Sequence, residues 1–349
     1  MEIFRGYLSV FGVTCNFWIA LGGAIYTVLR MVFGFNMKIG FIGLGKMGLR
    51  MAMKLFQEKH SLVVWNRTEE AISNFKFQIS NIKYKDQNFK TSKTIEELIK
   101  KLDKPRVVWV MVTAGSATQD VLDEVSKCVD KGDIIIDGGN SYYKDTQRRY
   151  EELKTKDIKF LGIGVSGGII AAKEGYPLMA GGDKSAYEFV QPILESLAKP
   201  NGGYDYFGTG GAGHFVKMIH NGIEYGIMQS LGEGFGVLDK APYKLDLLRI
   251  AKLYQKGTLV SGFMLDRTVE VLSKPSILSS IDGYIGESGE AGWTVEQAKK
   301  ENVPIEIIEK SLEFRKRSQK DSALQNSFAA KLIAALRHVF GGHGVKKGH

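Results

Sequence analysis

The sequence predicts an α/β protein in which an N-terminal Rossmann-type, doubly wound sheet is followed by an all-α C-terminal domain. From residue 37 to residue 168, runs rich in Val and Ile alternate with helix-like stretches, which is the pattern of βαβ units in a mainly parallel sheet. Beyond residue 213 the strand-like runs stop and long helical stretches follow. Because the glycine-rich segment GTGGAG at 208–213 separates the two patterns, we place one domain at 37–212 and the other at 213–340, with a tail at 341–349.

The individual elements follow from hydrophobic periodicity and from the glycine and polar residues that interrupt it. Strands, with the turns that end them, are predicted at 37–45, 61–66, 106–112, 133–139 and 158–168. Helices are predicted between them at 46–59, 69–79, 118–129 and 145–156. The C-terminal domain is predicted to contain helices at 214–239, 244–272, 294–300 and 304–338, with a loop at 274–293.

Residues 1–36 form a hydrophobic extension ahead of this domain. The stretch 6–29 has no charged residue and lies between Arg5 and Arg30, and an apolar stretch of about 18 residues or more is a candidate transmembrane helix. Polar residues and glycines dilute it, and it lacks the basic start and clean cleavage site of a signal peptide. Since Met37 opens a complete α/β domain, we prefer to interpret 1–36 as translated upstream sequence, with a membrane anchor at 6–29 as the alternative.

Length and composition are those of a globular protein with room for two domains. The 349 residues are 44% hydrophobic and 24% charged, with a formal net charge of +9. The positive charge is not gathered into a long run, and no zinc-finger spacing or RNA-binding signature occurs, which favours anionic small molecules over nucleic acid as partners. Cys15 and Cys128 form no CxxC motif, which predicts no disulfide framework, no metal site and a reducing compartment, the cytoplasm.

A dinucleotide-binding turn is predicted where the first strand ends. The segment GLGKMG comprises Gly43, Leu44, Gly45, Lys46, Met47 and Gly48. This is GxGxxG between a strand and a helix, in which the glycines allow a tight turn, close approach of a pyrophosphate, and close packing of helix on strand. The phosphates would bind at the helix N-terminus, where free N–H groups and the helix dipole favour anions. A purely structural glycine turn is the alternative.

The end of the second strand predicts NADP as the cofactor. An NAD site has Asp or Glu about 20 residues after the glycine motif to bind the ribose 2′-hydroxyl, but this chain has Asn66, Arg67 and Thr68. A neutral Asn does not repel a 2′-phosphate, Arg67 can bind one with two hydrogen bonds, and Thr68 can add a hydroxyl. In an alternative interpretation Asn66 is a helix N-cap with Glu69 as its N3 partner, although this does not account for Arg67.

Three further glycine-rich segments follow strands, namely MVTAG at 111–115, DGGNS at 137–141 and GVSGG at 164–168. In an open α/β sheet, ligands bind beyond the carboxyl ends of the strands. We therefore expect Asn140 and Ser166 to face the nicotinamide, and we place Val112 and Asn140 among the cofactor-binding residues. Asn140 and Ser166 could instead stabilise turns.

The segment KMIHNGIEYG at 217–226 brings four chemically different polar groups together. In a helix, Lys217, His220, Asn221 and Glu224 stand at i, i+3, i+4 and i+7, within a stripe about 100° wide. The apolar residues expected to face a core on the opposite side are Phe215, Met218, Ile219 and Ile223. A solvated polar face is the alternative, but such faces are built mostly from Glu, Lys and Ala, so the stripe predicts a functional wall.

Together these segments resemble the 6-phosphogluconate dehydrogenase family, the decarboxylating enzymes of the pentose phosphate pathway and of gluconate utilization. The motifs are GLGKMG, NRT, IIDGGNS, GVSGG, GAGHFVKMIHNGIEYG and RHVFGGH, and they lie between residues 37 and 343. The stretch 211–226 is the most specific and separates this family from its β-hydroxyacid dehydrogenase relatives. The chain looks like a short form of the family, in which the C-terminal helical part is reduced.

The resemblance implies a reaction and a role for each matching residue. The reaction is oxidative decarboxylation of 6-phospho-D-gluconate to ribulose 5-phosphate and CO2 with reduction of NADP+, with Lys217 as general base and acid and Glu224 as proton donor to C1. The implied substrate-binding residues are Asn140, Ser166, Gly167, Gly168, His220, Asn221, Tyr225, Arg315, Arg337 and His343. Of these, Tyr225 and Arg315 would reach the phosphate. The family inserts the residues of RHVFGGH from a neighbouring subunit, which implies a homodimer or homotetramer with a shared active site.

Two departures from the family pattern and two rival functions remain. After GVSGG the chain has IIAAKEG where many relatives have glutamates, and EAGWT places Gly292 where a basic residue precedes the WT pair, which puts one phosphate contact in doubt. One rival is a β-hydroxyacid dehydrogenase acting on a smaller acid without a phosphate, although Arg315, Arg337 and His343 argue against it. The other is an inactive NADP-binding protein.

Overall fold

The computed structural model describes residues 9–10, 13–14, 36–81 and 89–346. The chain divides into a short N-terminal unit, Met1–Met37, and a large unit, Lys38–His349. In the first unit the described residues form two antiparallel strands, β1 (Ser9–Val10) and β2 (Val13–Thr14). The predicted upstream segment at 1–36, and the alternative anchor at 6–29, fall almost entirely outside the described residues. No helix among the described residues is long and apolar enough to cross a membrane.

The first half of the large unit is built on an eight-stranded sheet with the order β10-β9-β8-β7-β6-β3-β4-β5. Neighbouring strands are parallel except for β8 and β9, which are antiparallel. The strands are β3 (Lys38–Ile42), β4 (Ser61–Trp65), β5 (Phe89–Thr91), β6 (Val107–Val110), β7 (Ile134–Asp137), β8 (Lys159–Val165), β9 (Leu178–Gly182) and β10 (Tyr204–Tyr206). The predicted mainly parallel, Rossmann-type sheet is confirmed.

Helices cover the sheet and enclose a core of Val, Ile and Leu side chains that includes Ile42, Val108 and Ile135. They are α2 (Lys46–Gln57), α3 (Glu69–Ser80), α4 (Ile95–Lys100), α5 (Ser116–Cys128), α6 (Tyr143–Lys154), η1 (Gly168–Ile170), α7 (Ala171–Glu174) and α8 (Lys184–Ala198). Sequence periodicity did not predict the elements from 169 to 207. Strand β9 has the sequence LMAGG and α8 contains Pro192, and both features obscure the usual patterns.

The second half of the large unit is all-α, as predicted. Its helices are α9 (Ala212–Asp239), α10 (Leu247–Tyr254), α11 (Phe263–Leu272), α12 (Pro275–Ser280), α13 (Glu290–Lys300), α14 (Glu306–Ser318), α15 (Ser322–Gln325) and α16 (Phe328–Gly341). The stretch 244–272, predicted to be helical, is divided into α10 and α11, because Gly257 and Gly262 have positive φ and separate the two helices. The stretch 304–338, also predicted to be helical, is divided in the same way, because Asp321 and Ser327 cap two new helices within it.

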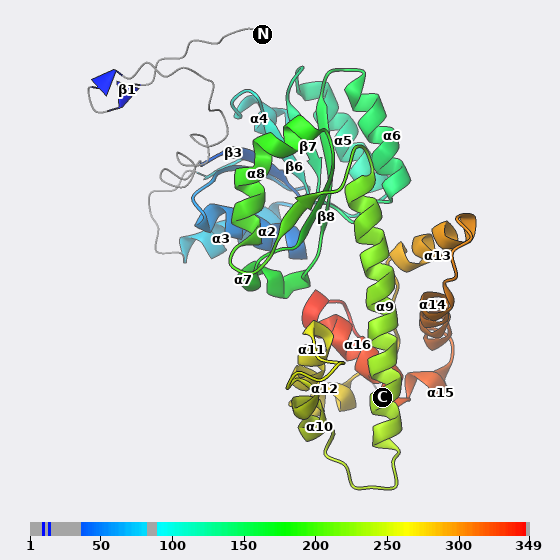
Figure 1. Cartoon of the computed structure of the whole chain (residues 1–349). Helices are drawn as coiled ribbons and strands as arrows, with labels where there is room; N and C mark the ends of the chain where they lie inside the picture. The colour runs from blue at the N-terminus through cyan, green and yellow to red at the C-terminus, as the bar shows by residue number, and fades with distance from the viewer. Residues whose placement is uncertain (1–8, 11–12, 15–35, 82–88, 347–349) are drawn as a thin grey trace. The chain divides into compact units, whose positions relative to one another are not determined.

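Helix α9 connects the two halves of the large unit (Figure 1). Its N-terminal part packs on β8 and β9, and its length packs on α13, α14 and α16. The glycines that make α9 a poor helix by propensity allow these close contacts. A Cβ on Gly213 would lie 2.4 Å from the carbonyl oxygen of Gly162, and a Cβ on Gly222 would lie 2.8 Å from Cγ2 of Thr294 on α13. Glycine at these positions therefore lowers the helix propensity of α9 but allows α9 to pack closely on β8 and α13.

Candidate active site

A cavity of about 1920 Å³ lies where the carboxyl ends of the strands, α9, α11 and α16 meet. The predicted catalytic and substrate-binding residues that line it are Lys217, Glu224, Asn140, Ser166, Gly167, Gly168, His220, Asn221, Tyr225, Arg315, Arg337 and His343. The fold thus brings together in one cavity residues that lie up to 203 positions apart, from Asn140 to His343. No residue of this predicted set lies outside it.

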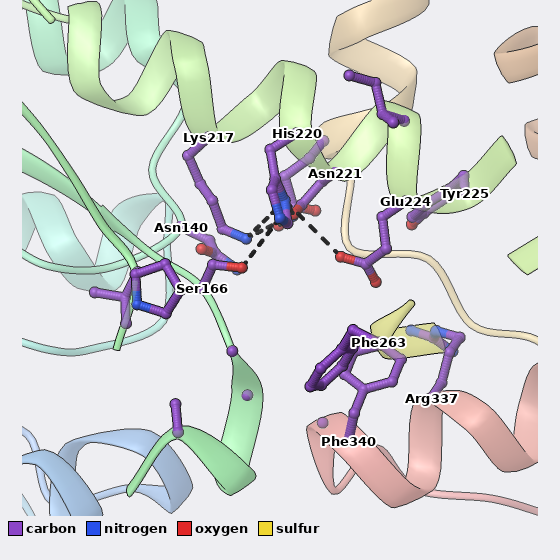
Figure 2. A pocket seen from close by; sticks show the side chains of 18 of the residues that line it. Asn140, Ser166, Lys217, His220, Asn221, Glu224, Tyr225, Phe263, Arg337 and Phe340 are labelled. Atoms are coloured by element: carbon purple, nitrogen blue, oxygen red, sulfur yellow. Dashed lines mark hydrogen bonds and ion pairs between the residues drawn. The ribbon is translucent and has the colours of Figure 1, made fainter. Parts of the chain in front are cut away.

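Lys217 is buried against the glycine-rich end of β8, with 6% of its surface exposed. A Cβ on Gly164 would lie 2.4 Å from Cβ of Lys217, so only glycine fits there. Nζ of Lys217 donates a 2.6 Å hydrogen bond to Oδ1 of Asn221 (Figure 2). Burial lowers the pKa of Lys217, an effect that the carboxylates of Glu224 and Glu290 oppose. A lowered pKa increases the fraction of neutral amine, which is the form that can act as a base.

His220 and Asn221 extend this cluster toward the sheet. Oδ1 of Asn221 also lies 3.0 Å from Nδ1 of His220, whose Nε2 lies 3.2 Å from Oγ of Ser166. Since an amide oxygen only accepts, Nδ1 carries the proton and Nε2 accepts from the Ser166 hydroxyl. Burial, aided by the nearby Lys217, lowers the pKa of His220 and favours this neutral form. Ser166, at the end of β8, is thereby connected to the wall formed by α9.

Glu224 stands two turns after Lys217 on the same helix and points into the same cavity (Figure 2). Its Oε2 lies 4.0 Å from Nδ1 of His220. Burial raises the pKa of Glu224, and this effect is opposed by the positive charges of Lys217, Arg315 and Arg337. A carboxyl group with a raised pKa retains its proton to higher pH and can act as a general acid.

Arg315 and Tyr225 form a cationic end of the cavity. The guanidinium carbon of Arg315 lies 3.1 Å from the centroid of the Tyr225 ring. Both terminal nitrogens of Arg315 and the hydroxyl of Tyr225 are buried without a hydrogen-bond partner among the described residues. Burial lowers the pKa of Arg315 to about 10, which still leaves it charged at neutral pH. A buried, charged group without partners is costly, so these donors fit a bound anion.

Arg337 and His343 line the same end of the cavity from α16 and the segment after it. Burial and the nearby charges of Arg337, Arg315 and Lys46 lower the pKa of His343 to about 4. The GVSGG segment packs closely on the end of α16. A Cβ on Gly168 would lie 2.1 Å from the carbonyl oxygen of Phe340, so glycine is needed for this contact. One chain therefore places both residues in its own cavity without a neighbouring subunit. The implied sharing of the site between subunits stays a prediction.

The GLGKMG turn fits a dinucleotide. Gly43 has φ of +99°, and a Cβ there would lie 2.2 Å from the carbonyl oxygen of Met111. A Cβ on Gly48 would lie 2.0 Å from the carbonyl oxygen of Gly43, so helix and strand need glycine to pack. A Cβ on Gly45 would meet nothing within 4 Å, and no side chain caps α2, which leaves its first N–H groups open to a ligand. The predicted cofactor-binding residues Gly45, Lys46, Met47, Gly48, Val112 and Asn140 line the cavity.

The predicted cofactor-binding residues that do not line the cavity are Gly43, Leu44, Asn66, Arg67 and Thr68. Oδ1 of Asn66 accepts a 2.8 Å hydrogen bond from the backbone N–H of Leu44 and so fixes the glycine turn. The interpretation of Asn66 as the helix N-cap is wrong, because Thr68 is the cap residue of α3. Arg67 and Thr68 are exposed at the end of β4.

A buried ion pair that sequence reasoning missed supports Asn140. Asp137, at the end of β7, accepts hydrogen bonds from the N–H of Gly139, from Oγ of Ser141 and from Arg149. The two charged side chains are 1% and 3% exposed. The signal was present in IIDGG, where a charged residue follows a buried strand directly. This pairing fixes the turn on which Asn140 faces the cavity.

Two expectations from the sequence change in the structure. Of the apolar residues expected to face a core, Met218 is 2% exposed, but Ile223 is 52% exposed and lines the cavity with Phe215 and Ile219. Within the polar stripe Lys217 and Asn221 are buried and His220 and Glu224 are partly buried, in a helix that packs on β8, β9 and α13. Gly292 lines a separate hollow of about 440 Å³ and not the cavity, which gives no support to the expected loss of a phosphate contact there.

Comparison with known proteins gives the same assignment over both halves of the large unit. The profile of the NAD binding domain of 6-phosphogluconate dehydrogenase matches residues 38–211, and that of the 6-phosphogluconate dehydrogenase C-terminal domain matches residues 213–327. The first half is thus a nicotinamide dinucleotide-binding domain. The Bacillus subtilis protein YqeC, named provisionally as a 6-phosphogluconate dehydrogenase, is 39% identical over 311 residues, which are 89% of this chain and 100% of that protein.

Two further relatives differ in cofactor. An NAD(+)-dependent, decarboxylating 6-phosphogluconate dehydrogenase of Haloferax volcanii is 32% identical over 312 residues, which are 89% of this chain and 99% of that protein. The solved structure of Plasmodium falciparum 6-phosphogluconate dehydrogenase, described in complex with NADP+ and with 6-phosphogluconate, aligns with a TM-score of 0.72 and 31% identity over 86% of this chain and 70% of that one. From these matches, the chain belongs to the 6-phosphogluconate dehydrogenase family of decarboxylating oxidoreductases.

Proposed function

We propose that the chain oxidises and decarboxylates 6-phospho-D-gluconate to ribulose 5-phosphate and CO2, with NADP+ as hydride acceptor. The observation that carries the proposal is that Lys217 and Arg315 line one cavity, where the Lys217 amine is buried and the terminal nitrogens of Arg315 have no hydrogen-bond partner among the described residues. Tyr225, which stacks on Arg315, stands eight residues after Lys217 on α9, about 12 Å further along the helix. A phosphorylated sugar acid has a hydroxyl to deprotonate toward one end and an anion at the other, which suits this spacing.

Lys217 is the base of the first step. Its neutral amine takes the proton of the 3-hydroxyl, and its lowered pKa supports this role. Asn221, which accepts one N–H of Lys217, orients the amine. A nicotinamide cofactor bound beside this amine would supply the hydride acceptor for C3. The nicotinamide dinucleotide would be held at the N-terminus of α2, by Gly45 to Gly48, with Val112 and Asn140.

Decarboxylation needs no further electron sink, because the 3-keto acid stabilises the charge that develops as CO2 leaves. Lys217, charged after the first step, stabilises the enolate oxygen by direct electrostatic attraction. Glu224, whose raised pKa favours its protonated form, gives its proton to the carbon that becomes C1 of ribulose 5-phosphate. His220 and Ser166, which are hydrogen-bonded to each other, bind substrate hydroxyls.

The choice of NADP+ over NAD+ rests on the residues after β4. Arg67 and Thr68 are exposed and can reach a 2′-phosphate, and the position of an acidic ribose ligand is taken by Asn66. The amide of Asn66 is bound to the glycine turn and carries no charge to repel that phosphate. The end of the cavity lined by Arg315, Arg337 and His343 favours a phosphorylated substrate. The smaller acid of a β-hydroxyacid dehydrogenase would leave the terminal nitrogens of Arg315 without a hydrogen-bond partner.

The test is to add 6-phosphogluconate with NADP+, and separately with NAD+, and to record both reduced cofactor and CO2. We expect the two products in equal amounts and a higher kcat/KM with NADP+. Gluconate and a short 3-hydroxy acid serve as controls and should be poor substrates. Reduction without CO2 release, or faster turnover of the short acid, would remove the proposal, and faster turnover with NAD+ would remove the cofactor assignment alone.

A further inference from the structure

Glu290, the first residue of the EAGWT segment, is a buried carboxylate beside the Lys217 cluster, and the reaction described above gives it no role. It is the first residue of α13 and is 2% exposed. Its Oε1 accepts a 3.1 Å hydrogen bond from Nδ2 of Asn221, and its Oε2 is buried without a hydrogen-bond partner among the described residues. Burial of a carboxylate is costly unless its charge interacts with a hydrogen-bond donor or a positive group, so we expect this charge to have a role.

The hydrogen bond from Asn221 fixes which end of the amide faces Lys217. A carboxylate only accepts hydrogen bonds, so it must face the NH2 end of Asn221. Oδ1 then faces Nζ of Lys217 at 2.6 Å and Nδ1 of His220 at 3.0 Å. If the amide were reversed, two acceptors would face each other at Glu290, and the NH2 group would meet the donors of Lys217 and His220. Glu290 therefore selects the one orientation in which every contact is a hydrogen bond.

The position of Glu290 is fixed by the packing of α13 on α9. Oγ1 of Thr294, one turn after Glu290, donates to the carbonyl oxygen of Met218 at 2.9 Å and also lies 2.9 Å from the carbonyl oxygen of Glu290. Gly222 leaves room for this threonine. The N-terminus of α13 also favours a negative charge at its first residue. The carboxylate is thus held by a rigid contact between two helices.

We propose that Glu290 is a positioning residue, whose carboxylate sets the orientation of the Asn221 amide and thereby aims the Lys217 amine at the substrate. The inference rests on the proposed function, since it needs Lys217 to be the base. An amine with one N–H already held has fewer orientations for its lone pair, so less order must be gained when the substrate binds.

The charge of Glu290 also acts on Lys217 directly. The titratable groups that act on Lys217 are Glu224 and His220 on its own helix and Glu290 on α13. Burial lowers the pKa of Lys217, and the two carboxylates oppose that shift. Removal of the Glu290 charge should therefore lower the pKa of Lys217 further. A residue with a merely structural role would change stability without moving this pKa.

The kinetic test compares Glu290→Ala and Glu290→Gln with the matched control Glu296→Gln, which removes an exposed carboxylate from the same helix. Glu290→Ala should lower kcat about ten- to a hundredfold with little change in the Kd of NADP+. Glu290→Gln should recover most of kcat, because a glutamine oxygen can still accept from Asn221. In a double-mutant cycle, adding Glu290→Ala to Asn221→Ala should cause no further loss. Wild-type kcat in a folded Glu290→Ala, or losses that multiply in the double variant, would overturn the inference.

A second readout needs no turnover. In enzyme labelled with ¹⁵N-lysine, with the Lys217 resonance assigned through Lys217→Gln, the Nζ of Lys217 should titrate at lower pH in Glu290→Gln than in wild type and be unchanged in Glu296→Gln. An unmoved titration in Glu290→Gln would overturn the inference. If wild-type enzyme fails to turn over 6-phosphogluconate, the proposed function fails, while this titration still decides whether Glu290 is coupled to Lys217. If Glu290→Ala does not fold, the Glu290→Gln arm carries the test.

Discussion

Gly164→Ala should disable the enzyme by displacing Lys217, although residue 164 contributes no chemical group. An added Cβ would lie 2.4 Å from Cβ and 2.8 Å from Cγ of Lys217. Carbon atoms in contact stay about 3.5 to 4.0 Å apart, so β8 or α9 must move by about 1 Å. Overpacking of this kind costs about 1 to 3 kcal/mol of folding free energy, and a displacement of about 1 Å in a catalytic group costs about a hundredfold in rate.

The assay is steady-state kcat with 6-phosphogluconate and NADP+, together with urea unfolding and the Kd of NADP+. We expect a loss of about a hundredfold in kcat, a lower urea midpoint and an unchanged Kd. Gly203→Ala is the matched control, because a Cβ there meets nothing within 4 Å, and it should leave kcat unchanged. If Gly164→Ala kept wild-type kcat and stability, α9 could not lie against β8 as described, and the account of Lys217 would lose its geometric basis.

Three other predictions concern the cofactor, the phosphate and pH. In fluorescence titrations, Arg67→Glu should raise the Kd of NADP+ at least about tenfold more than the Kd of NAD+, because a carboxylate would repel the 2′-phosphate. Equal effects on the two Kd values would remove the 2′-phosphate assignment. Arg315→Met should raise the KM for 6-phosphogluconate about ten- to a hundredfold, because buried charge-assisted hydrogen bonds to the substrate are lost. An unchanged KM would show that Arg315 does not bind substrate. The kcat/KM should fall tenfold per pH unit below the pKa of Lys217, because only the neutral amine is a base. Burial holds that pKa below its ordinary 10.5, so an acid limb at 10.5 or above would contradict the role.

The sequence predicts the fold class because its local signals agree with one another. The strand before GLGKMG, the helix after it and the repeated β-branched runs all indicate the same parallel sheet, and the structure has it. The boundaries within the helical half were less predictable. Residues 244–272 have a helical composition throughout. The break between α10 and α11 depends on the backbone conformation of Gly257 and Gly262 rather than on a change of hydrophobic pattern.

The candidate site was predictable where its residues are close in sequence. Lys217, Asn221 and Glu224 lie on one helix, so the period of the helix alone brings them together. Which side of that helix is buried was not predictable, because β8 and α13 cover it and both lie far away in the chain. Glu290 gave no signal for the same reason, since its contact with Asn221 joins residues 69 positions apart.

The central claim, that Lys217 is the base of the reaction, is tested most directly by single-turnover measurement of Lys217→Ala with saturating 6-phosphogluconate and NADP+. We predict no NADPH above background and no CO2, while the Kd of NADP+ stays within about twofold of wild type, because the glycine turn on α2 that would hold the cofactor does not involve α9. NADPH formation by Lys217→Ala at a rate within about tenfold of wild type would contradict the account.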